Sequence, residues 1–156
     1  MIAQQTLDWV FSRTGARALA EATLLQNLWG GYGELWRLGL RGGSVASVIL
    51  KCVVPPERAQ SSTSDRRKRR SYEVERAFYQ QDFRGCDTDC RMAACYGVEA
   101  PLLLLEDLGT AGFRPGRPPN IRAGLRWLAH FHSRFLGGGH PGLWEQGSYW
   151  HLETRQ

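Results

Sequence analysis

The apolar positions predict four short β-strands. Apolar and β-branched residues gather in runs that glycine, proline and polar residues separate, which is typical of strands. The runs cover residues 22–28, 35–40, 47–54 and 99–105. Residues 41–44 carry two glycines between the second and third runs, and glycine tolerates the positive φ of a hairpin turn. These strands are therefore expected to form a small antiparallel sheet.

Helical periodicity predicts three helices, over 6–11, 71–81 and 121–136. The last is the clearest. Its apolar stripe comprises Leu125, Leu128, Ala129, His132, Phe135 and Leu136. The polar residues 57–65 predict a mobile loop, and 112–120 predicts a linker because it holds three prolines and two glycines. Residues 82–97 fit no single pattern. The expected fold class is α+β, with one domain over 1–108 and a linker plus a lone helix over 109–156.

The positive charge of the chain is concentrated in one run. The net charge is +5, and residues 66–70 contribute five positive charges; without them 15 basic residues face 15 acidic ones. A nucleic-acid-binding surface would spread its charge more widely, so this run favours a solvated loop and makes nucleic acid an unlikely partner. Arginine outnumbers lysine 18 to two. Lys51 stands out because it ends an apolar strand, where a charge is costly.

Two classes of protein are disfavoured by the sequence. Its longest apolar runs are far shorter than the ~20 residues that span a bilayer, and its first residues lack the basic and apolar regions of a secretory signal. We therefore expect a cytoplasmic protein with no membrane partner. The four cysteines form no Cys-x-x-Cys pair, so no metal site is predicted and reduced thiols are expected.

The order of the remaining pieces suits a nucleoside triphosphate. Glycines between two strands let backbone N–H groups approach phosphate oxygens. A strand lysine neutralises phosphate charge, and a helix glutamate holds that lysine by an ion pair. An apolar strand then runs into a connector whose backbone groups can meet an adenine edge.

The segments that carry these pieces are 28–34 (LWGGYGE), 48–51 (VILK), 71–79 (SYEVERAFY), 103–108 (LLLEDL) and 128–132 (LAHFH). In this order and spacing, the chain resembles the first half of the choline-kinase and ecdysteroid-kinase-like branch of the aminoglycoside phosphotransferase family. The resemblance implies a protein-kinase-like N-terminal lobe with a five-stranded sheet, followed by a linker and the first helix of a truncated C-terminal lobe.

The resemblance also implies roles for particular residues. Gly31 and Gly33, with Gly30, resemble the nucleotide loop, although the third glycine of Gly-x-Gly-x-x-Gly is replaced by tryptophan. Lys51 resembles the lysine that contacts phosphates, and Glu75, rather than Glu73, resembles its helix partner. Glu106 and Leu108 resemble the hinge that binds adenine through backbone atoms. The implied cofactor is ATP.

The departure from the family concerns catalysis. The family's catalytic and Mg²⁺-binding aspartates lie beyond the amphipathic helix, and this sequence has no aspartate after Asp107. Mg²⁺ is expected for the family, but its ligands are absent here. We therefore expect no catalytic or metal-binding residues, and a truncated phosphotransferase that is inactive alone. A small-molecule hydroxyl acceptor is expected only for a full-length relative.

Simpler interpretations stay open. The glycines could form an ordinary hairpin turn, Lys51 could extend its amine into water, and the acidic residues after the last strand could cap a turn. Two other functions are also compatible with the sequence. One is a non-catalytic partner or regulatory module that self-associates through the exposed apolar helix and the tail. The other is a nucleic-acid-associated protein that acts through 66–70.

Overall fold

The computed structural model describes residues 2–57, 63–81, 86, 88–114, 116, 118 and 120–144. The elements it describes are three helices and five strands. In chain order they are α1 (Gln4–Thr14), β1 (Ala18–Asn27), β2 (Gly33–Arg41), β3 (Ser47–Val53), α2 (Thr63–Tyr79), β4 (Cys95–Glu99), β5 (Leu102–Glu106) and α3 (Ile121–Phe135). The chain is therefore α+β, as predicted. The division at residue 108 stays a prediction.

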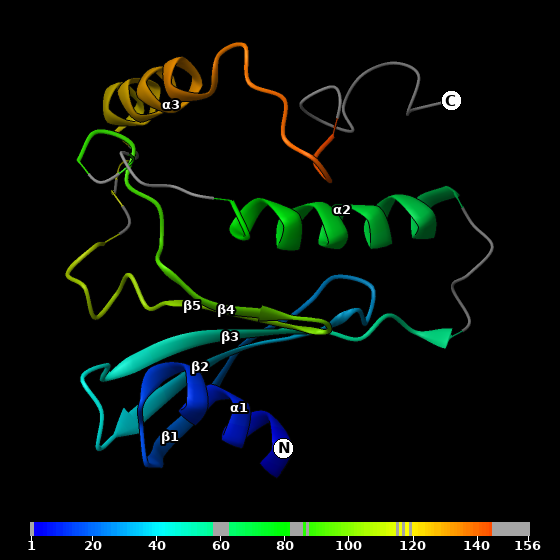
Figure 1. The fold of residues 1–156 in the computed structure, drawn as a ribbon, viewed down its shortest axis with the longest axis vertical. Coiled ribbons are helices and arrows are strands. Elements are labelled where there is room, and N and C mark those ends of the chain that lie inside the picture. Colours follow the sequence, from blue (N-terminus) through cyan, green and yellow to red (C-terminus); the bar gives the residue numbers. More distant parts are fainter. Residues whose placement is uncertain are drawn as a thin grey trace.

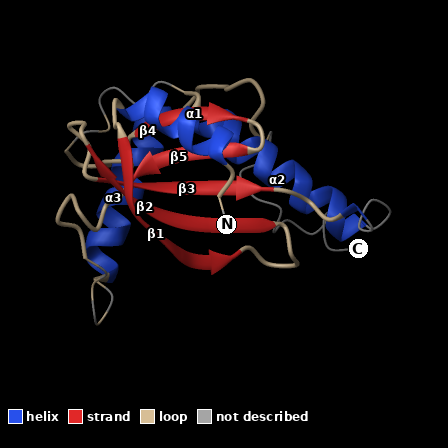
Figure 2. Ribbon diagram, turned by 90° about the horizontal axis from the view of Figure 1, so that it is seen from below, coloured by secondary structure: helices blue, strands red, loops and turns tan. Residues whose placement is uncertain are grey.

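The five strands form one antiparallel sheet in the order β1-β2-β3-β5-β4, which Figure 2 shows from the side of α1. The β2–β3 connection forms the predicted hairpin. β3 is central, and its residues are paired on both sides: Lys51 faces Leu35 of β2 and Leu103 of β5. Lys51 therefore lies inside the strand, two residues before its end, rather than at the end as predicted.

The main hydrophobic core lies between the sheet and α1, below the sheet in Figure 1. Side chains alternate along a strand, so Val48 and Leu50 of β3 face α1 and pack with its buried Val10. Leu104 of β5 joins the same cluster. The alternate residues of β3, Lys51 among them, face α2 on the other side of the sheet. One face of β3 thus supports the fold, and the other presents the candidate chemistry.

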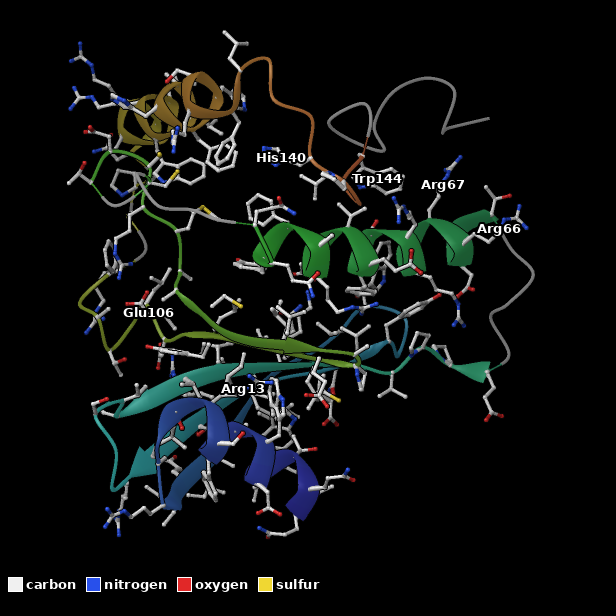
Figure 3. The ribbon with its side chains drawn as sticks, in the orientation of Figure 1. Arg13, Arg66, Arg67, Glu106, His140 and Trp144 are labelled. Atoms are coloured by element: carbon white, nitrogen blue, oxygen red, sulfur yellow. The ribbon has the colours of Figure 1, made fainter. Side chains whose placement is uncertain are left out.

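The expectation of a mobile polar loop over 57–65 and of a solvated loop over the basic run 66–70 is wrong where helix α2 occupies these residues. It begins at Thr63 and contains all of residues 66–70 (Figure 3); residues 58–62 lie outside the described part. Apolar periodicity is missing from this first half, and charge pairing within the helix takes its place. Arg69 donates to Asp65 at 2.7 Å, and Arg70 lies 3.3 Å from Glu73.

Two strands occupy the region where the sequence predicted one. The apolar run 99–105 is divided by a turn at Ala100 and Pro101, so Glu99 ends β4 and Leu102 begins β5. The first three residues of β4, 95–97, lie in the segment that fitted no pattern. The partial exposure of β4 explains why its sequence lacks the strong apolar character of β5.

Helix α3 lies beyond α2 on the same side of the sheet (Figure 1). The predicted apolar stripe is exposed, as expected for an apolar helix face without packing partners, since Leu125 and Leu128 lie in solvent. The opposite, inward side of α3 is aromatic: Trp127 stacks on Phe131 at 5.0 Å, and its indole N–H donates to the Arg91 carbonyl at 3.1 Å. The tail from residue 145 onward lies outside the described residues. None of the described helices has the length and apolar character needed to cross a bilayer.

Candidate functional site

Lys51 and Glu75 meet between β3 and α2, as the sequence predicted. The ammonium nitrogen of Lys51 lies 2.7 Å and 2.5 Å from the two carboxylate oxygens of Glu75. The two side chains are 15% and 31% exposed, so the pair lies at the edge of the solvent rather than in the core. The Lys51 amine also lies 4.9 Å from the ring centroid of Tyr72, an attractive cation–π geometry. Because two of its three N–H groups face Glu75, the amine keeps one donor for an anion.

Tyr72 stays a neutral phenol beside this pair. Burial raises the pKa of the Tyr72 hydroxyl, and the nearby Glu75 carboxylate raises it further. The tyrosine is therefore a hydrogen-bond donor and a ring surface for Lys51 at physiological pH, and it adds no negative charge to the site.

The glycine turn joins β1 to β2, and its glycines do different things. Gly30 and Gly31 have φ of 76° and 73°, which only glycine adopts without strain. A side chain on Gly31 would meet nothing within 4 Å. At Gly33 (φ 128°), by contrast, a Cβ would come within 2.0 Å of the Cys52 carbonyl oxygen. Gly33 therefore serves the close pairing of β2 with β3, while the backbone at Gly30 and Gly31 is open to solvent.

Backbone donors of this turn are available. The Gly31 N–H bonds to the Leu28 carbonyl, and the Leu28 N–H bonds to the Gly33 carbonyl. The N–H groups of Trp29, Gly30 and Tyr32 donate no hydrogen bond to any described residue. The free N–H groups of Trp29 and Gly30 are consecutive, and consecutive free N–H groups in a turn with left-handed residues attract anions.

The sequence missed an aromatic cluster beneath the turn. Tyr32 is buried against Leu28, Val53 and Tyr72, with 5.8 Å between the two tyrosine ring centroids. Lys68 of α2 lies 5.1 Å from the Tyr32 ring centroid. Both lysines of the chain lie over aromatic rings of this cluster. The scarcity of lysine in the sequence was therefore the one signal that could have pointed to it.

Glu106 and Leu108 lie apart from this group. Figure 3 shows Glu106 at the end of the sheet away from Arg66 and Arg67. Its carboxylate accepts from Arg91 at 2.6 Å and from the Ala94 N–H at 3.0 Å. Partial burial opposes ionisation, but these two hydrogen bonds hold the pKa of Glu106 below its ordinary value. The Leu108 carbonyl accepts from the Phe113 N–H at 2.9 Å, so it is already satisfied within the connector.

Asp107, between them, has a structural task. It accepts from the Arg37 Nε at 2.9 Å, the Ser47 hydroxyl at 2.7 Å and the Gly109 N–H at 3.0 Å. The last bond is the turn cap that the sequence allowed for. Burial opposes the charge of Asp107, but these hydrogen bonds and the Arg37 guanidinium hold its pKa below the ordinary value. Asp107 thus fixes the connector to β2 and β3.

No cluster of three or more His, Cys, Asp or Glu side chains that could hold a metal ion occurs among the described residues. The site therefore consists of a cation, its carboxylate partner, open backbone donors and aromatic rings. That set can bind an anion.

The fold and site define an α+β lobe in which a strand lysine, a helix glutamate and a glycine turn lie on one face of an antiparallel sheet. Comparison of the chain with protein-family models, curated proteins and solved structures gave no match. The resemblance to small-molecule kinases therefore stays a prediction.

Proposed function

We propose that residues 1–108 bind a nucleoside triphosphate, as the nucleotide-binding lobe of an ATP-dependent phosphotransferase that acts on a small-molecule hydroxyl. The observation that carries the proposal is the bidentate Lys51–Glu75 ion pair. A lysine held this way has its amine fixed in position, as a phosphate-binding lysine requires. An ordinary surface lysine gains little from such a pair.

The glycine turn and the connector supply the other contacts. The free N–H group of Gly30 would donate to a phosphate oxygen, and the amine of Lys51 would neutralise the phosphate charge. The backbone around Glu106 and Leu108 would meet the adenine edge. The Leu108 N–H donates to no described residue, whereas its carbonyl is already bonded, so this contact relies on the N–H.

The proposal covers nucleotide binding, and phosphoryl transfer requires groups beyond it. No aspartate follows Asp107 in these 156 residues, and no described cluster of acidic side chains suits Mg²⁺. A carboxylate that orients an acceptor hydroxyl would have to come from elsewhere. No step of the transfer is therefore assigned to this chain's residues.

Calorimetric titration with ATP tests the proposal. Lys51→Met removes the amine but keeps an unbranched side chain of similar length, and we expect the Kd for ATP to rise about tenfold or more, since one charge-assisted contact is lost. Arg13→Gln is the matched control, because Arg13 also pairs with a glutamate but does so from α1 on the other face of the sheet. Equal ATP affinity in Lys51→Met and the parent chain, with far-UV circular dichroism unchanged, would refute the phosphate role.

A partner or regulatory module is the second candidate, and exposed apolar residues on α3 favour it. Ile121 is 73% exposed and Leu125 is 61% exposed, which is unusual for a helix whose other side is packed. A chain that sediments as a monomer at every concentration would argue against self-association. A nucleic-acid role has less support, because Arg69 and Arg70 are held in ion pairs within α2.

A further inference from the structure

A pocket of about 280 Å³ lies between the glycine turn and the first half of α2. It is lined by Trp29, Ser64, Arg67, Lys68, Ser71 and Tyr72. The five helix residues recur at spacings of three and four, so they share one face of α2. Neither Lys51 nor Glu75 lines this pocket. Tyr72 contributes to both places, with the Lys51 amine 4.9 Å from its ring.

The pocket is positively charged. Arg67 and Lys68 supply two cations, no described carboxylate lines the pocket, and neither cation forms an ion pair with a described residue. The next two residues of the helix, Arg69 and Arg70, are both paired with acids. The unpaired charges of the basic run therefore point to an anionic ligand, and the Ser64 hydroxyl adds a neutral donor. The Ser71 hydroxyl already donates to the Arg67 carbonyl at 2.9 Å.

The opposite wall is aromatic. Trp29 is 83% exposed, so its indole offers an open face at the mouth of the pocket. Lys68 lies 5.0 Å from the Trp29 ring centroid and 5.1 Å from that of Tyr32. Gly30 permits this approach, because a Cβ there would come within 3.0 Å of the Lys68 amine. The lysine is thus held at the boundary between the ring and the cationic helix face.

We propose that this pocket binds a phosphate monoester carried on a planar aromatic ring. The phosphate is bound by Arg67 and Lys68 together with the Ser64 hydroxyl, because arginine and lysine bind phosphate through charge-assisted hydrogen bonds. The ring stacks on Trp29, as aromatic ligands stack on exposed indoles. The pocket volume is near the lower end of the range for small-molecule sites. It therefore favours a ligand with a single ring system over a polymer.

The test uses 1-naphthyl phosphate as the probe and the whole chain as the receptor. Saturable binding with a stoichiometry of one is expected by calorimetry. Inorganic phosphate and 1-naphthol, which each carry half of the ligand chemistry, are expected to bind at least about tenfold more weakly. Equal affinity for inorganic phosphate and the probe would show that the ring contributes nothing and would overturn the proposal.

Two variants and one control assign the contacts. Lys68→Gln and Trp29→Ala are each expected to raise the Kd about tenfold, through the lost charge and the lost stacking surface. Arg66→Gln removes the same charge from the same run but from a residue outside the pocket, and its Kd is expected to change less than threefold. An Arg66→Gln effect as large as that of Lys68→Gln would mean diffuse charge attraction and would overturn the site.

Failure of this inference is distinguishable from failure of nucleotide binding at Lys51. Lys51→Met is expected to leave the affinity for 1-naphthyl phosphate unchanged, since Lys51 does not line the pocket. Loss of naphthyl phosphate binding in Lys51→Met would show that the two ligands share one site and would refute the separate pocket. Trp29 is mostly exposed, so Trp29→Ala keeps the test valid even if a variant within α2 unfolds.

Discussion

Replacement of Asp107 by alanine is expected to destabilise the fold more than any other single loss of charge among the described residues. The Asp107 side chain is 3% exposed and accepts three hydrogen bonds, from Arg37, Ser47 and Gly109. Its removal leaves the buried Ser47 hydroxyl without its acceptor. It also separates the connector from β2 and β3.

The magnitude follows from these contacts. A hydrogen bond to a charged group contributes about 1.5–3 kcal/mol, and the loss of one buried partner of an ion pair costs about 3–5 kcal/mol. The side chain of Arg37 is 47% exposed and can return to water, so the lower end applies. We expect Asp107→Ala to lower the free energy of unfolding by about 3 kcal/mol and Asp107→Asn, which keeps an acceptor, by about half of that.

Urea denaturation followed by circular dichroism measures this change. Asp8→Asn is the control, because Asp8 is exposed and, among the described residues, accepts only from Gln4; it should change the free energy of unfolding by less than about 0.5 kcal/mol. The pH dependence gives a second readout. The pKa of Asp107 is lowered in the fold, so its contribution is present above the ordinary carboxyl pKa and is lost as pH falls through the lowered value. Equal stability of Asp107→Ala and the parent chain at pH 7 would refute the reasoning.

Three further outcomes are expected. In a double-mutant cycle of Lys51→Met and Glu75→Gln, urea denaturation should give a coupling energy of about 1 kcal/mol; additivity would mean that the pair is not formed in solution. Gly33→Ala should unfold the chain or cost more than about 3 kcal/mol by the same measurement, because its Cβ would overlap a carbonyl of β3, whereas Gly31→Ala should cost about 1 kcal/mol for its positive φ alone. Leu125→Gln should weaken self-association in sedimentation velocity, and a parent chain that is monomeric throughout would contradict that expectation.

The parts of the fold that could be predicted are those with a strong local pattern. β3 has a nearly continuous apolar and β-branched run, and α3 has helical periodicity, so both were located to within a residue or two. The first half of α2 was missed because charge pairs such as Asp65–Arg69 support that helix. An apolar-periodicity analysis assigns such a stretch to a loop.

The candidate site likewise has features that could be predicted from the sequence and features that could not. The approach of Lys51 to Glu75 was implied by the family resemblance, although 24 residues separate them in the chain. The different structural roles of Gly31 and Gly33 could not be predicted from the sequence, because they depend on how closely a carbonyl of the neighbouring strand approaches each glycine. The task of Asp107 depends on Arg37, a residue 70 positions away. Long-range packing of this kind leaves no trace in a local sequence window.

The placement of the two lysines makes the chain its own spectroscopic reporter. Reductive methylation with ¹³C-formaldehyde keeps the charge of an amine, and only Lys51 and Lys68 carry side-chain amines. Each lies about 5 Å from an aromatic ring centroid, so ring currents would shift its methyl resonances and separate the two signals. One resonance would then follow the ion pair with Glu75, and the other would follow the mouth of the pocket at Trp29.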